Sequence, residues 1–168
     1  MLLAASVMWP ATVVAQTAAD PRLVFEAKFP LGDVSGRIDH LSVDVKRQRL
    51  FVAELGNNSL GVIDLAAGKV LRRIDGLSEP QGVAYVPFTD SVFVANAGDG
   101  SVRVLRGDDL TPMGRIELGD DADNVRVDAA RDRVLVGLRQ GCACGHRSRK
   151  PNQDCRYPPQ SPSGGVPD

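Results

Sequence analysis

The strongest constraint on this sequence is a repeat of 42 residues. Three apolar runs keep this spacing, with LFVAE at 50–54, VFVAN at 92–96 and VLVGL at 134–138. A repeat of this length has the size of one four-stranded β-propeller blade. Each unit of such an array needs neighbours to cover its faces, so function belongs to the array more than to one unit. We therefore predict an all-β chain built of propeller blades.

The segments around these runs keep the same period. Many alternate apolar and polar residues, as half-buried strands do. The Gly-, Asn- and Asp-rich stretches between them are typical of tight hairpins, because these residues tolerate a positive φ. Each unit is thus predicted to hold four strands, which fall at 41–44, 50–54, 59–64 and 69–74 in the first unit and at 83–86, 92–96, 101–106 and 113–118 in the second, with 125–128 and 134–138 in the third.

These units amount to two and a half to three blades, over residues 22–140. A closed propeller uses about four to eight blades, so 168 residues predict an open fragment, the front part of a larger protein. Residues 23–28 (LVFEAK) are predicted to form an outer strand without the rest of its blade. In a closed ring such a terminal strand often completes the last blade, and we expect the same of this one.

The repeat resembles the YVTN family of bacterial β-propeller repeats. The resemblance lies in the strand VFVAN at 92–96, the Val-Ile-Asp strand at 62–64 and the Pro-x-Gly sequence at 80–82 that leads into the next unit. It extends over about residues 24–137, although Glu54 and Leu138 stand where the family prefers Asn. The resemblance implies a non-catalytic binding or scaffold propeller.

Charge and the first residues bear on location and partners. The formal net charge is −1, with a pI near 6.1, so the chain lacks the basic field that attracts nucleic acid.

Residues 1–19 are predicted to be a signal peptide and leader, with a short apolar core and a small-residue exit at Ala15. No transmembrane segment is expected, and we predict export to the periplasm or beyond. No Lys or Arg precedes the apolar core; a misplaced start codon explains this, and the alternative is a disordered apolar tail.

The periodic pattern stops at residue 141. Residues 141–168 contain all three cysteines and five of the eleven prolines, but no Ile, Leu, Met or Phe. Such a stretch cannot bury enough apolar surface to offset its ordering entropy, so it is predicted to be disordered. We interpret it as an out-of-frame tail after a reading-frame slip near residue 140. Back-translation shifted by one nucleotide permits a Val-Ile-Asp strand and a Pro-x-Gly sequence in the expected order.

The alternative for this tail is a metal site. Cys142, Cys144, His146 and Cys155 offer thiolate and imidazole ligands within fourteen residues. The Cys-x-Cys-x-His spacing is neither that of common zinc sites nor that of covalent haem attachment. We therefore predict no metal and no cofactor.

The candidate ligand site is derived from the repeat itself. The first strand of a propeller blade lines the central channel, and the residues just before it lie near the channel mouth. The 42-residue period places five polar residues there, which we predict to contact a ligand: Asp39, His40, Gln81, Asp123 and Asn124. His40 and Asp39 are also able to bind a metal or act as a general base. The alternative is that these residues only form turns, as Asp, Asn and Gln-Gly often do.

Three hypotheses of function remain open. The first is an exported β-propeller that binds an unknown protein or small-molecule ligand, with no catalytic residues. The second is a propeller hydrolase similar to lactonases, with a metal at the channel mouth. No Gly-x-Ser-x-Gly, phosphate-binding Gly-Lys-Ser/Thr or His-Glu-x-x-His motif is present. The third is a truncated product with no function of its own.

Overall fold

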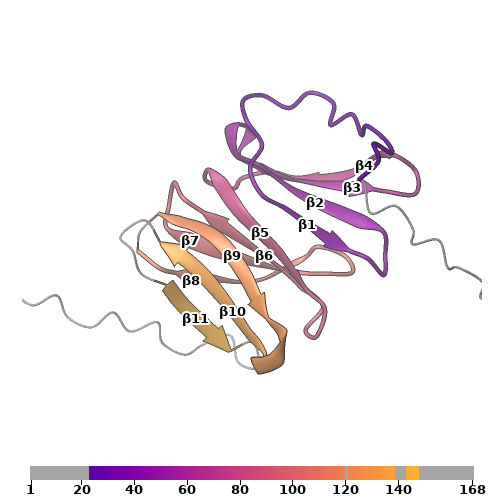
Figure 1. Ribbon diagram of the computed structural model, residues 1–168. Helices are drawn as coiled ribbons and strands as arrows, with labels where there is room; N and C mark the ends of the chain where they lie inside the picture. Colours follow the sequence, from indigo (N-terminus) through magenta and orange to yellow (C-terminus); the bar gives the residue numbers. More distant parts are fainter. Residues whose placement is uncertain (1–22, 120, 139–142, 148–168) are drawn as a thin grey trace, which may run out of the picture.

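The computed structural model describes residues 23–119, 121–138 and 143–147, which form three antiparallel sheets (Figure 1). We call these sheets blades 1, 2 and 3. Blade 1 contains β1 (Leu41–Asp44), β2 (Arg49–Glu54), β3 (Ser59–Asp64) and β4 (Lys69–Ile74). Blade 2 contains β5 (Pro80–Val86), β6 (Ser91–Asn96), β7 (Ser101–Arg106) and β8 (Pro112–Glu117). Blade 3 contains β9 (Ala122–Asp128), β10 (Arg133–Leu138) and β11 (Ala143–Arg147).

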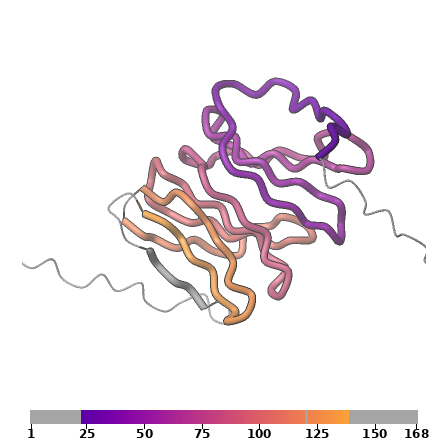
Figure 2. The backbone as a smooth tube through the Cα atoms, in the orientation of Figure 1, coloured from indigo at the N-terminus to yellow at the C-terminus, as the bar shows by residue number. Residues whose placement is uncertain are grey.

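The strands predicted from the repeat are present, and their pairing repeats from blade to blade. Ser42 pairs with Phe51 in blade 1, Ala84 with Phe93 in blade 2, and Arg126 with Leu135 in blade 3. A one-residue slip would turn every side chain to the opposite face of its sheet. The 42-residue period therefore fixes which residues of each blade face the neighbouring blade. Figure 2 shows the resulting succession of similar hairpins along the chain.

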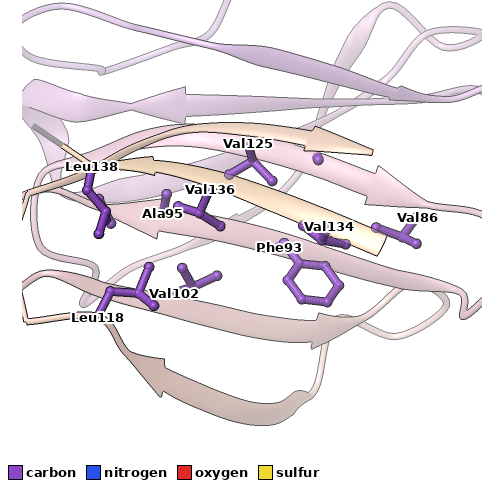
Figure 3. Packing of buried hydrophobic residues seen from close by; sticks show 11 residues of the cluster. Val86, Phe93, Ala95, Val102, Leu118, Val125, Val134, Val136 and Leu138 are labelled. Atoms are coloured by element: carbon purple, nitrogen blue, oxygen red, sulfur yellow. The ribbon is translucent and has the colours of Figure 1, made fainter. Parts of the chain in front are cut away.

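Apolar faces of successive blades pack against each other. Between blades 2 and 3, Phe93 and Ala95 lie among side chains of β9 and β10 (Figure 3). Between blades 1 and 2, Phe51 stacks on Tyr85 with ring centroids 6.2 Å apart. Each fully buried Val, Leu or Phe contributes about 1.5–3 kcal/mol relative to an exposed one. The larger buried members of the two clusters are Phe51, Leu60, Val62, Val92 and Val94 on one side, and Val86, Phe93, Val102, Val134 and Val136 on the other.

A polar cluster joins blades 1 and 2 at one edge of the apolar contact. The Arg47 guanidinium donates to the Asp44 carboxylate (2.8 Å) and to both oxygens of Asp90 (2.8 and 2.6 Å). It also lies 3.2 Å from the Tyr85 hydroxyl, which donates to Asp90. The hydrogen bond from Arg47 lowers the pKa of Asp90, whereas burial raises the pKa of Tyr85. Charge-assisted, bidentate contacts of this kind add specificity as well as energy.

Glu54, which stands where the sequence resemblance predicts Asn, is accommodated by three residues around it. Its side chain is buried and accepts hydrogen bonds from Arg73 (2.8 and 3.1 Å) and from the Ser59 hydroxyl. Arg73 also donates to the Leu31 carbonyl at 2.7 Å, and the bond with Glu54 raises the pKa of Arg73. A Cβ on Gly61 would lie 2.5 Å from the Glu54 carboxylate. Blade 2 instead carries the expected Asn96, which donates to Ser101.

Two expectations for the chain ends meet the structure only in part. Residues 23–28 do not form the predicted outer strand, and Phe25 is 72% exposed. A strand needs a partner strand to hydrogen-bond with, and no described strand pairs with this segment. Within the tail predicted to be disordered, the structure instead places β11 against β10. Residues 1–19 and the rest of 141–168 lie outside the described residues, so their predicted roles remain predictions.

Among the described residues, no helix has the length and apolar character needed to cross a membrane.

We predict that Arg73→Met destabilises the chain by about 3 kcal/mol, because it leaves the buried Glu54 carboxylate without its cation. The full chain would be unfolded in urea and followed by far-UV circular dichroism. Arg115→Met is the matched control: Arg115 pairs with exposed Glu117 and has the corresponding place in blade 2. Equal midpoints for the two variants would contradict a structural role for the Glu54–Arg73 pair.

Candidate functional site

The segments that precede the first strands of the blades lie next to one another, as the repeat predicts. Asp39 and His40 extend the pairing of β1 with β2, because the Asp39 amide donates to the Ala53 carbonyl at 2.8 Å and the Ala53 amide donates to the His40 carbonyl at 3.0 Å. The His40 amide then donates to the Gln81 carbonyl at 3.2 Å, which links blade 1 to blade 2. The structure thus brings His40 and Gln81 together through their backbones.

Gly82 allows the same approach between blades 2 and 3. A Cβ on Gly82 would lie 2.0 Å from the Asp123 carbonyl oxygen and 3.0 Å from the Val125 amide. Real Cβ atoms do not come so close to backbone, so only glycine allows β5 and β9 to lie this near each other. The line of contacts from His40 through Gln81 and Gly82 to Asp123 runs across all three blades.

A pocket of about 640 Å³ opens beside this line of contacts. Two of the predicted residues, Gln81 and Asp123, line it. Its volume falls in the range of small-molecule sites, about 300–1,000 Å³. The other residues of the wall come from the β4–β5, β6–β7 and β8–β9 connections and from the end of β10: Glu79, Ala97, Asp121, Gly137 and Leu138.

The wall of the pocket is acidic. Glu79, Asp121 and Asp123 supply three carboxylates, and Gln81 adds an amide that both donates and accepts. Concave sites of one charge sign raise the local concentration of the opposite ion. The pocket is therefore suited to a ligand that carries positive charge and hydrogen-bond donors, whereas Leu138 offers an apolar contact.

Glu79 has a backbone conformation that is uncommon for its residue type. Its φ is +48°. Its amide is fixed in place, because it donates a hydrogen bond to the Asn58 side-chain oxygen at 2.9 Å. Its carbonyl accepts from the Ala97 amide at 3.0 Å. Blades 1 and 2 together hold this residue at the rim. Non-glycine residues in the left-handed region are costly and often occur at ligand sites.

His40 and Asp39 lie outside the wall of the pocket. The His40 Nδ1 and an Asp39 oxygen are 3.1 Å apart, but they are poorly aligned for a hydrogen bond. The other Asp39 oxygen accepts from Arg37 at 3.3 Å. Among the described residues, no three or more His, Cys, Asp or Glu side chains are grouped so as to hold a metal ion. The metal chemistry of the hydrolase hypothesis thus has no ligand set in the described part of the chain.

Asn124 also lies outside the pocket wall, beside Gly137, which lines it. Its side-chain oxygen is buried and has no hydrogen-bond partner among the described residues. The repeat does not point to Glu79 or Asp121 as site residues. In the sequence, Glu79 is only part of the segment that leads into the second blade. Asp121 belongs to the acidic stretch at 119–123, which is also typical of a solvated turn.

Comparison with known proteins shows the fold. No family model and no curated protein matches the sequence. Among solved structures, the hydrazine synthase of Kuenenia stuttgartiensis matches with a TM-score of 0.57 and 19% identity, over 68% of this chain and 32% of that chain. Sqt1 of Saccharomyces cerevisiae matches with a TM-score of 0.60 and 11% identity, over 68% of this chain and 34% of that chain.

Both of these proteins contain a β-propeller. The chain is part of a β-propeller. It spans about a third of the length of each of the two matched chains. At identities of 19% and 11% the likeness is one of fold, and fold alone does not select a function. Altogether 633 solved chains match, so the fold is shared by many proteins and the function must be argued from the site.

We predict that Gly82→Ala lowers the free energy of unfolding by about 3 kcal/mol, because the new methyl group would push β5 away from β9. Gly114→Ala is the matched control, since a Cβ on Gly114 in β8 would have nothing within 4 Å. Its effect should stay within about 0.5 kcal/mol. Urea unfolding of the full chain measures both. A Gly82→Ala chain as stable as the control would show that β5 and β9 are not in close contact.

Proposed function

We propose that this protein is an exported, non-catalytic β-propeller of the YVTN-repeat type that binds a ligand at the mouth of its channel. The observation that carries the proposal is the acidic pocket beside the first strands of blades 2 and 3. Gln81 and Asp123, both predicted from the period alone, line it together with Glu79 and Asp121. We infer that the ligand is a small molecule or peptide segment with positive charge.

The geometry supports binding more than catalysis. Among the described residues, the pocket wall offers carboxylates and one amide but no Ser, Thr, Cys, Lys or His. His40 lies outside that wall. Carboxylates with a hydrogen-bonding amide are the groups that recognise ammonium or guanidinium donors.

The YVTN assignment rests on the repeat and on its partial departures. Asn96 has the place of the family's Asn and caps its blade by donating to Ser101. Glu54 takes this place in blade 1, where Arg73 balances its charge. Both versions end the second strand with a buried polar group that ties it to the third strand. The blades therefore keep the same architecture even where the residue at this position differs.

Trilysine serves as the first probe for this site. We expect it to bind the full chain in isothermal titration calorimetry, with an affinity that falls as salt rises, because the attraction is between exposed charges. The double variant Glu79→Gln, Asp123→Asn should weaken binding by about tenfold, since each lost charge pair contributes up to about 1 kcal/mol.

Two controls make this test specific. Triglutamate has the same length and the opposite charge, and it should not bind. Glu117→Gln removes an exposed carboxylate of β8 that does not line the pocket, and it should leave trilysine binding unchanged. If the pocket variant binds trilysine as tightly as the unaltered chain, the proposed ligand site is wrong.

Export is tested separately. We expect the full chain, when produced in a bacterium, to collect in the periplasm and to lose its first residues near Ala15–Asp20 through signal peptidase. Mass spectrometry of the periplasmic fraction would locate the new N-terminus. Val7→Arg with Val13→Arg, which interrupts the apolar core, should retain the chain in the cytoplasm. An uncleaved cytoplasmic product from the unaltered sequence would overturn the export proposal.

A further inference from the structure

Blades 1 and 3 share a charged triad that blade 2 lacks. Each member of the triad in blade 3 lies 84 residues, or two periods, after its counterpart in blade 1. The intermediate positions in blade 2 carry Val86, Thr89 and Ser91, none of which is charged. The three equivalent pairs are Asp44 and Asp128, Arg47 and Arg131, and Arg49 and Arg133.

In blade 1 the arginines of this triad form hydrogen bonds with the next blade. Arg47 is held by Asp44 and makes a bidentate contact with Asp90 of blade 2, next to the Tyr85 hydroxyl. Arg49 donates to the Asp108 and Gly107 carbonyls, at 2.8 and 3.2 Å, in the connection between β7 and β8. The acceptors are thus a carboxylate and a phenol from one hairpin and backbone carbonyls from another.

In blade 3 the same triad is in place, but it faces outward. Asp128 lies 3.3 Å from Arg131 and 3.7 Å from Arg133, as Asp44 lies close to Arg47. The Arg131 side chain is 66% exposed, whereas that of Arg47 is 25% exposed. The Arg133 Nε is buried and donates to no acceptor among the described residues.

This face of blade 3 also carries different side chains from the equivalent face of blade 2. Val134 and Val136 of β10 turn toward blade 2, so the intervening Leu135 and, opposite it, Arg126 lie on the outward face. Arg126 is exposed, and Leu135 is 37% exposed. The outward face therefore combines an excess of guanidinium groups with an apolar centre where Phe51 and Phe93 lie in the other blades.

We propose that the outward face of blade 3 is an interaction surface for a further blade of the ring, whose first hairpin presents an aspartate and a tyrosine as blade 2 does. Arg131, held by Asp128, donates to that aspartate, and Arg133 donates to nearby backbone carbonyls. Leu135 packs against the aromatic ring, in the place where Phe51 packs against Tyr85. Charge complementarity selects the partner, since a blade without a carboxylate there leaves Asp128 alone to balance the two arginines.

A second copy of this chain does not meet that description. The outward face of blade 1 carries Val43 at the position of Tyr85 and Gln48 at the position of Asp90. Gln48 and Asp90 share the left-handed backbone, with φ of +52° and +46°, so the two positions correspond in conformation as well as in sequence. The acceptor groups of Tyr85 and Asp90 therefore have no counterpart in blade 1.

This difference supplies the test. Val43→Tyr with Gln48→Asp gives the outward face of blade 1 the missing acceptors, and both positions are exposed. We expect the full-length double variant to self-associate about tenfold more tightly than the unaltered chain, which corresponds to about 1.4 kcal/mol. Sedimentation velocity over a range of concentrations measures this, and raised salt should weaken the association.

Further variants identify the surface involved. Adding Arg131→Met and Arg133→Met to the double variant should return its self-association to that of the unaltered chain, whereas adding Arg115→Met should not. Circular dichroism checks that each variant is folded, and Gln48→Asp alone replaces the double variant if the tyrosine disturbs the sheet. The proposal is overturned if the added acceptors bring no tighter association, or if the association survives loss of the two arginines.

Discussion

Burial of both faces of each sheet is the constraint on which the whole structure depends. A four-stranded sheet with apolar residues on both faces cannot remain in water, and each blade here solves the problem by packing on the next. Phe51, Val92 and Val94 belong to one such contact, and Phe93, Val134 and Val136 to the other. Because strand residues alternate between faces, the 42-residue period must be kept at single-residue accuracy. This register fixes the positions of the pocket, of the close contact at Gly82 and of the polar clusters.

The outward face of blade 1 is covered in a different way. Ile63 is fully buried although its face is turned away from blade 2, and the segment before β1 lies over this side. Arg73 donates to the Leu31 carbonyl, and the Ser35 hydroxyl donates to the Asn57 side chain at 3.2 Å. Val43, at 46% exposure, stays only partly covered. The local chain thus substitutes for a neighbouring blade at one end of the sheet and leaves the other end open.

The repeat predicted most of the fold because strand positions, faces and hairpins all follow from one period. It also predicted that Gln81 and Asp123 lie near each other, since both precede the equivalent point of a first strand. It could not predict that Glu79 and Asp121 complete the pocket wall, because their places depend on how neighbouring blades tilt and on the backbone of Glu79. The expected strand at 23–28 failed for a related reason: strand formation needs a free edge, and sequence pattern does not say whether one is within reach.

The polar contacts between blades help to determine which blade packs next to which, whereas the apolar contacts do so less. Apolar packing is non-directional, so it restricts the order of the blades less than paired charges do. The contact of blades 1 and 2 adds Arg47 and Arg49 with specific acceptors, whereas the corresponding positions of blade 2 are Thr89 and Ser91. A wrong neighbour for blade 1 would leave Asp44 buried and Arg47 without its carboxylate, which costs more than lost apolar contact. The two described interfaces thus differ in charge, and this difference restricts the order in which the blades can assemble.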